Sequence, residues 1–202
     1  WYNAPNLSAA RTDVGATSYN GYIYGVGGYT TSVQTTSQFA AVNNGGVGNL
    51  SSWSSKNTGI GSTLYSHGFA YSRGYFYLTG GDTSGGGAAA TANTYYGSIA
   101  NDGSISSWTS TSALGTARHS HGTYISDGYI YVVGGAAAGG STISSVEYAA
   151  INSNGTLGSW STATATLNMK QFASTTYNGY LYALGGTNGS LSTTVSYANV
   201  SG

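Results

Sequence analysis

The residues best able to do chemistry in this chain gather in one cluster, Arg118-His119-Ser120-His121. Histidines this close together suggest ligands for a zinc or copper ion, because imidazole suits both metals. Side chains alternate along a strand, so His119 and His121 would face opposite ways in an extended segment. The two rings would then be poorly placed to bind one ion. We therefore predict neither a metal site nor a bound cofactor.

Three other segments occupy the same place in a repeated pattern of the sequence. They are Arg11-Thr12-Asp13-Val14, Leu64-Tyr65-Ser66-His67 and Met169-Lys170-Gln171-Phe172. If the repeats are arranged around an axis, these segments lie near one rim or near a central channel, where His67 and His121 can approach each other. We expect no catalytic residue. The candidate ligand-binding residues are Arg11, Tyr65, His67, Arg118, His119, His121 and Lys170.

Ionisable groups are otherwise scarce. The 202 residues include five acidic residues, five Lys or Arg and three His, and the net charge is zero. Asp102 and Asp127 lie in Asp-Gly pairs, where aspartate is an ordinary turn residue. No two carboxylates share an obvious site, which gives little support to a glycosidase. The basic patch typical of nucleic-acid-binding proteins is also missing from the sequence. We therefore expect a protein that is not an enzyme and has no nucleic-acid partner.

The composition places further bounds on the class of protein. The sequence contains no cysteine, which excludes disulfides, thiolate chemistry and cysteine-based zinc sites. No apolar run approaches the roughly 20 residues that cross a bilayer, so we expect no membrane span. Ser, Thr, Asn and Gly replace charged residues as the source of solubility, which favours an extracellular or cell-surface location. The sequence opens on Trp1, so we expect a mature or trimmed part of something longer.

One phrase of the sequence, Ser-Asp-Gly-Tyr-Ile-Tyr-Val-Val-Gly-Gly at 126–135, recurs in similar form four times. Its second glycine is Gly28, Gly81, Gly135 or Gly186, so the copies lie 53, 54 and 51 residues apart. The Asn-Gly, Asp-Gly and Arg-Gly pairs predict two-residue hairpin turns, because such residues adopt positive φ at low cost. The aromatic and β-branched residues that follow predict a strand that ends on the glycine pair. A period of this length indicates an array of β units.

The rest of the unit repeats as well. An aromatic, a small residue, any residue and a β-branched residue predict a third strand at 39–42, 96–99, 148–151 and 197–200. A Gly-x-Leu/Ile-x-Ser-Trp sequence then ends on Trp53, Trp108 and Trp160, around which we expect a fourth strand. One tryptophan at a fixed place in each repeat predicts packing between units; stacking on a sugar is the alternative. Helix is nearly excluded, because no long window holds a 3.6-residue period.

These features together resemble the kelch repeat. The shared features are the glycine pair, a tyrosine shortly before it, an aromatic residue on the third strand and a tryptophan on the fourth. Arg118 and His121 also match the family's Arg-x-x-His lead-in. The resemblance covers essentially the whole chain and implies a kelch-like β-propeller with one four-stranded blade per repeat. Two departures weaken the transfer of charged-residue roles: the third strand lacks the family's Tyr-Asp pair, and Arg-x-x-His is intact in one repeat alone.

We predict a single domain over 1–202, with repeat units at about 1–53, 54–108, 109–160 and 161–202. The last unit ends before its tryptophan, whereas Trp1 stands at the fourth-strand place with no strands before it. Residues 1–3 are therefore expected to complete the last blade, beside the strand at 195–200. Two ring sizes stay open: a closed ring of four blades, or part of a larger ring of about six to eight blades, formed by a longer chain or by self-association.

For function, the sequence favours a non-catalytic extracellular module, either binding or structural, with a protein or glycan partner on a propeller face. A carbohydrate-binding propeller is the first alternative. A kelch-like sugar isomerase or mutarotase that uses Arg118, His119, His121 and Lys170 is the second. Fold resemblance does not choose among these, because propellers carry many functions.

Overall fold

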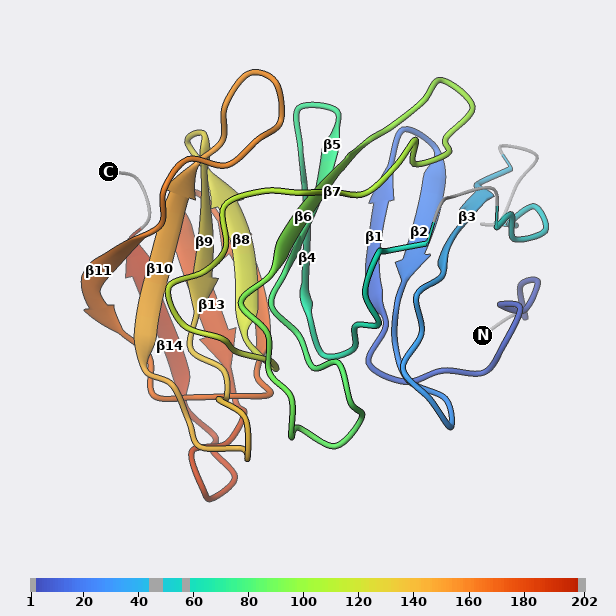
Figure 1. Ribbon diagram of the computed structural model, residues 1–202. Helices are drawn as coiled ribbons and strands as arrows, with labels where there is room; N and C mark the ends of the chain where they lie inside the picture. Colours follow the sequence, from blue (N-terminus) through green and yellow to red (C-terminus); the bar gives the residue numbers. More distant parts are fainter. Residues whose placement is uncertain (1–2, 44–48, 56–58, 200–202) are drawn as a thin grey trace.

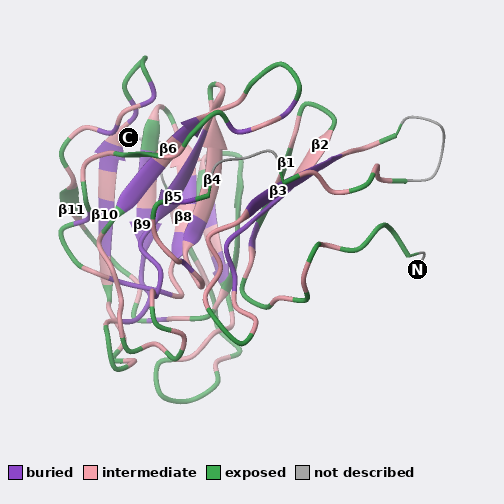
Figure 2. Ribbon diagram, turned by 45° about the vertical axis from the view of Figure 1, so that its right-hand side comes forward, coloured by how far each residue is buried: buried purple, intermediate pink, exposed green. Residues whose placement is uncertain are grey.

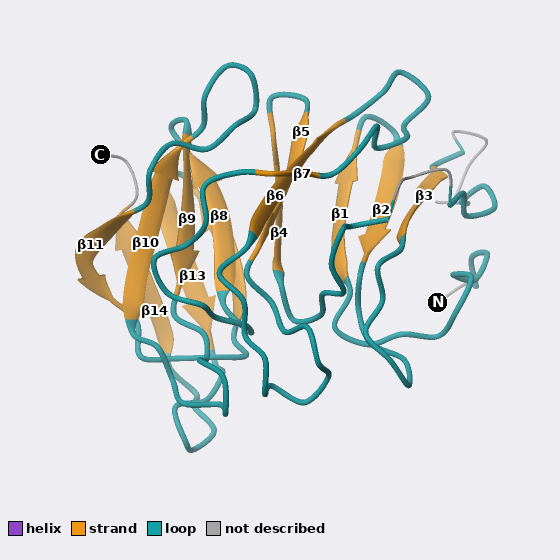
Figure 3. Cartoon of the chain, viewed as in Figure 1, coloured by secondary structure: helices purple, strands orange, loops and turns teal. Residues whose placement is uncertain are grey.

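The computed structural model describes residues 3–43, 49–55 and 59–199, and this part of the chain is all-β, without a helix (Figure 3). Its strands form four antiparallel sheets of three or four strands. Figure 1 shows the first three sheets of the chain side by side and the fourth, with β13 and β14, behind the third; the N-terminus lies on the side of β3 and the C-terminus on the side of β11. Among the described residues there is accordingly no helix with the length and apolar character needed to cross a bilayer.

Each sequence repeat forms one sheet. Sheet 1 consists of β1 (Gly15–Tyr19), β2 (Tyr22–Val26) and β3 (Ser37–Ala41). Sheet 2 consists of β4 (Gly68–Ser72), β5 (Tyr75–Thr79), β6 (Thr94–Ser98) and β7 (Thr109–Ser110). Sheet 3 consists of β8 (Gly122–Ser126), β9 (Tyr129–Val133), β10 (Ser145–Ala150) and β11 (Ser161–Thr166). Sheet 4 consists of β12 (Ala173–Tyr177), β13 (Tyr180–Leu184) and β14 (Val195–Asn199).

A two-residue turn joins the first two strands of every sheet, as the sequence predicts. In sheet 3 the turn residues Asp127 and Gly128 have φ values of 48° and 81°. Positive φ at both positions defines a type I′ turn, whose twist matches that of the flanking strands. The other three turns have the same signs of φ and consist of Asn20-Gly21, Arg73-Gly74 and Asn178-Gly179.

The glycine pairs are needed because the next sheet lies very close to them. A Cβ atom on Gly80 would lie 2.4 Å from the carbonyl oxygen of Arg118 and 2.8 Å from the His121 ring. The N–H of Gly81 donates to the same Arg118 carbonyl at 2.8 Å. The same arrangement joins sheet 1 to sheet 2, where Gly27-Gly28 meets Leu64 and His67. It also joins sheet 3 to sheet 4, where Gly134-Gly135 meets Met169 and Phe172.

The hydrophobic core is divided into layers, one between each pair of neighbouring sheets. Tyr24 of sheet 1 meets Phe76 of sheet 2 edge-on, with ring centroids 4.5 Å apart. Tyr77 of sheet 2 belongs to a cluster with Ile130 of sheet 3. The third layer joins sheets 3 and 4 and includes Leu181. Figure 2 shows buried segments in the strands of sheets 1 to 3, whereas the long loops are largely exposed. Each sheet is thus stabilised by its neighbours.

The tryptophans lie at these layers. The indole N–H of Trp108 donates to the Ser37 hydroxyl of sheet 1 at 2.9 Å, and that of Trp160 donates to the Ser112 carbonyl at 2.7 Å. Both rings are partly buried against the core clusters. The strands β7 and β11 begin after the tryptophan rather than around it.

Sheet 1 departs from the expected four strands. Leu50 and Ser54 form single bridges with Val42 and Phe39, in place of a regular fourth strand within the described residues. Its neighbourhood includes residues 44–48 and 56–58, which lie outside the described part.

The sequence predicts that residues 1–3 pair with the strand at 195–200. Most of this pairing lies outside the described residues, because residues 1, 2 and 200 are not described. Asn3 lies in no strand, and β14 pairs with β13 alone among the described strands. The first strands lie next to one another in the order β1, β4, β8 and β12, and the described residues do not form a closed ring. The fold is therefore propeller-like, with β1 and β12 at the two ends of the row.

Candidate functional site

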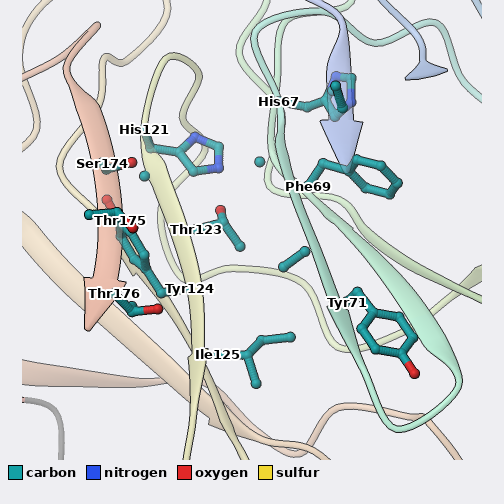
Figure 4. A pocket seen from close by; sticks show the side chains of 15 residues that line it. His67, Phe69, Tyr71, His121, Thr123, Tyr124, Ile125, Ser174, Thr175 and Thr176 are labelled. Atoms are coloured by element: carbon teal, nitrogen blue, oxygen red, sulfur yellow. The ribbon is translucent and has the colours of Figure 1, made fainter. Parts of the chain in front are cut away.

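The four first strands line one hollow of about 470 Å³ (Figure 4). Its wall is mainly glycine, hydroxyl and imidazole groups from all four sheets. Figure 4 shows His121 and Thr123 on one side of β8 and Tyr124 on the other, as expected for alternation along a strand. Besides the tyrosines Tyr71 and Tyr124, the polar residues of the wall are His67, His121, Thr123, Ser174, Thr175 and Thr176.

A repeated backbone conformation lines a second hollow, of about 350 Å³, that shares His67 and His121 with the first. The residues Asp13, Ser66, Ser120 and Gln171 are equivalent and have φ values of 51°, 49°, 54° and 55°. Left-handed φ is costly for residues other than glycine and persists where the surroundings require it. Here it directs the N–H of Ser66, Ser120 and Gln171 to the carbonyl of the equivalent residue in the preceding sheet, at 3.4, 2.8 and 3.0 Å. Each junction therefore has this backbone hydrogen bond in addition to the one donated by the second glycine of the pair.

His67 and His121 belong to neighbouring sheets and line both hollows. His121 Nε2 lies 3.0 Å from the Thr79 hydroxyl, which lies 2.8 Å from the Thr123 hydroxyl. Both ring nitrogens of His67 and Nδ1 of His121 are buried without a hydrogen-bond partner among the described residues. Burial lowers the pKa of His67 to about 4; burial, aided by the positive charge of Arg118, lowers the pKa of His121 to about 3. Both rings are therefore neutral at neutral pH.

The two arginines among the candidate residues bind within their own sheets. Arg118 is wholly buried, and its Nη1 donates to the Gly134 and Ser145 carbonyls, each at 2.9 Å. Its Nη2 donates to the Glu147 carboxylate at 2.5 Å. Arg11 is only partly buried, and its Nη1 donates to the Gly27 carbonyl at 3.0 Å. These guanidinium groups hold the second and third strands together and do not extend into the hollow.

The other three candidate residues lie along the loops that follow the glycine pairs. The Tyr65 hydroxyl accepts from the N–H of Gly86 at 2.5 Å and from that of Gly87 at 2.8 Å. His119 Nδ1 lies 3.0 Å from the Ser120 hydroxyl, and Lys170 Nζ donates to the Gly140 carbonyl. The candidate residues therefore separate into three groups: the hollow, the sheet interiors and the loops. Of the seven, His67 and His121 alone line the hollow.

A buried carboxylate near His119 has a structural explanation. Asp82 is fully buried, and its oxygens accept from the backbone N–H groups of Ser84 at 2.7 Å, Gly85 at 3.1 Å and Ala89 at 3.2 Å. Burial alone raises the pKa of Asp82, but the hydrogen bonds from Ser84, Ala89 and Gly85 outweigh it, so the pKa is lowered. This carboxylate is a charged acceptor that holds its loop, and it does not face the hollow.

The hollow is chemically polar and uncharged. Among the described residues there is no group of three or more His, Asp or Glu that could hold a metal ion. The sequence reasoning missed the hydroxyl groups of Thr123 and of residues 174–176. Thr123 lies two residues after His121, and residues 174–176 follow Phe172, on strands that the sequence predicts. These positions could have indicated the hydroxyl groups. The arrangement can donate and accept hydrogen bonds, as a neutral solute requires.

A second feature is the outer face of sheet 4, which we define as Tyr182, Leu184, Val195 and Tyr197. Tyr182 pairs with Tyr197 and Leu184 with Val195, so the four side chains share one face. Leu184 is 41% exposed, Val195 59% and Tyr197 70%. The equivalent residues of sheet 1 are buried under sheet 2 and consist of Tyr24, Val26, Ser37 and Phe39. Sheet 4 thus exposes an apolar surface that its counterpart in sheet 1 buries.

Comparison with known proteins does not add a functional assignment: no family model matches the chain, and no curated protein matches it significantly. Function is therefore argued from the hollow and from the outer face of sheet 4.

Proposed function

We propose that this chain is a non-catalytic, extracellular interaction module of the kelch-like propeller type, and that the outer face of sheet 4 holds a protein partner. The observation that carries the proposal is the contrast between equivalent residues. Tyr197 is 70% exposed, whereas its equivalent Phe39 is 6% exposed beneath sheet 2. A face built for burial in one repeat and left open in another is suited to receive a further surface.

The composition of this face supports the proposal. Contiguous exposed apolar patches are uncommon on monomeric proteins and often mark interaction sites. Tyrosine is enriched at the centres of protein interfaces, because its large ring is ordered at low entropic cost. The rings of Tyr182 and Tyr197 lie 6.2 Å apart and extend this surface across β13 and β14. Tyr177, which is 75% exposed, continues it on β12.

The state of the ionisable groups supports a non-catalytic role. Arg118 and Glu147 are paired inside sheet 3, and Asp82 is surrounded by backbone N–H groups. The neutral imidazoles of the hollow are weak general acids near neutral pH. The isomerase alternative would need Arg118 to face a substrate, but its guanidinium group is occupied by the strands of its own sheet.

The accessibility of individual tyrosines tests the proposal. In a dilute solution of the isolated chain, we expect Tyr197 to react with a tyrosine-acylating reagent, and Tyr24 and Tyr77, which are fully buried, to resist it. A bound protein partner should protect Tyr197, as read by mass spectrometry of peptides. If Tyr197 is as unreactive as Tyr24 in a chain that sediments as a monomer, the face is covered by its own chain and the proposal is wrong.

A second candidate function is binding of a neutral glycan in the hollow. The observation that favours it is the pair of imidazoles with unpartnered nitrogens beside the hydroxyl groups of Thr123 and Ser174. Such groups suit the hydroxyls of an uncharged sugar. Screening neutral oligosaccharides against the wild-type chain and a Thr123→Val variant tests this function. An absence of binders for the wild type, or equal binding by both proteins, would argue against it.

A further inference from the structure

Two backbone hydrogen bonds and one side-chain contact recur at each junction between neighbouring sheets. At the junction of sheets 2 and 3, the Gly81 N–H donates to the Arg118 carbonyl, and the Ser120 N–H donates to the Ser66 carbonyl, each at 2.8 Å. In the side-chain contact, a tyrosine on the second strand of one sheet shares a hydrophobic cluster with an apolar residue on the second strand of the next sheet. The tyrosine is the one equivalent to Tyr182 of sheet 4. The three such pairs are Tyr24 with Phe76, Tyr77 with Ile130, and Tyr131 with Leu181.

The two ends of the row of sheets carry the unmatched halves of this junction. At sheet 4, the unmatched groups are the N–H of Gly186 and the carbonyl of Gln171. In each of the other three sheets, the equivalent two groups form hydrogen bonds with the sheet that follows. At sheet 1, the unmatched groups are the carbonyl of Arg11 and the N–H of Asp13. In sheets 2, 3 and 4, the equivalent two groups form hydrogen bonds with the sheet that precedes. None of these four groups is hydrogen-bonded to another described residue. Each end therefore offers one donor and one acceptor to the other.

The space at the glycine pair shows the same difference. A Cβ atom on Gly185 would meet a single close neighbour, the Ser192 carbonyl at 3.4 Å. On the equivalent Gly80 a Cβ atom would lie 2.4 Å from the backbone of the next sheet. The position beside Gly185 is thus open, and the equivalent of His121 that would fill it belongs to sheet 1 and is Val14.

Sheet 1 retains the apolar side chains that such a junction requires. Ile23 pairs with Ala40 in the register in which Leu181 pairs with Ala198. Leu181 is 4% exposed against sheet 3, whereas Ile23 is half-buried. Leu7 and Trp53 lie beside it, within 4 Å of where a Cβ atom on Gly25 would be. We call Leu7, Ile23 and Trp53 the receiving face of sheet 1.

We propose that the receiving face of sheet 1 in a second copy of this chain occupies the outer face of sheet 4. This assignment rests on the proposed function, because it names the partner of the same face. A head-to-tail contact of this kind joins two different surfaces and closes when the rotation between copies allows. Two copies related by a twofold axis would form two identical junctions and one ring of eight sheets, four from each copy. Eight lies within the range of propeller sizes.

The geometry favours a second copy over closure within one chain. The two faces belong to the first and the last sheet of the series β1, β4, β8 and β12, and the described residues do not close that series into a ring. β12 is exposed along its whole length, whereas β4 and β8 lie between other first strands. A net charge of zero also avoids long-range repulsion between copies. In the contact, the Gly186 N–H would donate to the Arg11 carbonyl and the Asp13 N–H to the Gln171 carbonyl of the other copy.

Charge insertion at each face, followed by mixing, tests the proposal. Analytical ultracentrifugation should show a dimer for the wild type and a monomer for Tyr197→Glu and for Ile23→Glu. Mixing the two variants should restore a dimer, because one copy keeps an intact outer face and the other an intact receiving face. Tyr129→Glu is the matched control, since Tyr129 is 40% exposed on sheet 3 and belongs neither to the outer face of sheet 4 nor to the receiving face of sheet 1; it should remain dimeric. Circular dichroism verifies folding, and Ile23→Thr replaces Ile23→Glu if the latter unfolds.

The other outcomes separate this inference from the proposed function. A dimer that survives Ile23→Glu would indicate contact between two outer faces and would overturn the head-to-tail arrangement. Oligomers that grow without limit as concentration rises would overturn the closed dimer. A monomer with reactive Tyr197 would overturn the second copy as partner and leave the face available to another protein. A monomer with Tyr197 and the Gly186 amide both protected would mean closure within one chain and would overturn both proposals.

Discussion

Arg118 and Glu147 are paired inside sheet 3 at the positions that Arg11 and Gln38 hold in sheet 1. The Arg118 Nη2–Glu147 Oε1 distance is 2.5 Å, and the corresponding Arg11 Nη2–Gln38 Oε1 distance is 3.5 Å. Sheets 2 and 4 have no charged pair at this place among the described residues; they carry Leu64 with Tyr95 and Met169 with Ser196. An arginine at the first position is therefore accompanied by Gln or Glu at the second, each a hydrogen-bond acceptor, whereas an apolar residue at the first position is accompanied by neither.

We expect Arg118→Leu to lower the free energy of unfolding by about 3–5 kcal/mol, because it leaves a buried carboxylate without its partner. Glu147 is 2% exposed and also accepts from the Gly115 N–H at 2.6 Å, so it cannot simply turn to solvent. The double variant Arg118→Leu/Glu147→Tyr reproduces the pair of sheet 2 and should recover much of the loss. Urea unfolding measures both. Equal destabilisation by the single and double variants would show that the ion pair is not the cause.

The hairpin turn of sheet 3 gives a purely backbone prediction. Gly128 has a φ of 81°, and a Cβ atom there would meet nothing closer than the Arg73 side chain at 3.7 Å. Gly128→Val should nevertheless reduce stability by more than about 1 kcal/mol, because β-branched residues resist left-handed φ. Gly128→Asn is the control and should cost less, since asparagine tolerates this conformation. Thermal unfolding that is the same for both variants would contradict the turn assignment.

The junction between sheets 1 and 2 depends on Trp108. We expect Trp108→Ala to cost about 3 kcal/mol, toward the lower end of the range for removing a large aromatic ring, because this ring is only partly buried. The loss includes contact with Phe69, whose ring centroid lies 6.5 Å away, and the hydrogen bond to Ser37. Trp108→Phe should retain most of the packing and lose the hydrogen bond. A cost below about 1 kcal/mol for the alanine variant would assign the ring a surface role.

The parts of the fold that the sequence predicts correctly are those with local causes. Asp127-Gly128 specifies its turn through the φ values that its two residues tolerate, and the adjacent strands follow from their aromatic and β-branched residues. The glycine pair is likewise a local signal of close approach, although the group that approaches Gly80 comes from another repeat.

The parts that the sequence leaves open depend on contacts between distant residues. Arg118 precedes His121 by three residues in the sequence. Its hydrogen-bond partner Glu147, however, lies 29 positions away, and this contact places the guanidinium group inside sheet 3. The neutrality of His67 likewise follows from burial against sheet 1, which no local pattern reveals. The exposure of Tyr197 depends on whether another sheet covers it. Repetition alone therefore predicts the unit but not which of its positions become a site.

The histidines of the hollow should make stability depend on pH in a defined window. Their pKa values in the folded chain are about 4 for His67 and about 3 for His121, below the ordinary value of 6.5. Above pH 6.5 both folded and unfolded chains carry neutral rings, and the full stability is present. As the pH falls below 6.5, the unfolded chain takes up protons that the folded chain does not, so stability falls until the pH reaches the folded pKa values.

Urea unfolding near neutral pH and at about pH 5 measures this loss. A fully shifted histidine contributes about 1.4 kcal/mol per pH unit, and we expect about 1 kcal/mol per unit for the pair, since both residues are only partly buried. The matched variants are His67→Phe and His121→Phe, because Phe172 fills the equivalent place in sheet 4. Each should flatten the pH dependence in this window. Asp82 contributes at lower pH, since its pKa is lowered from 3.8. A slope unchanged in the double variant would mean that other groups, such as His119, produce the dependence.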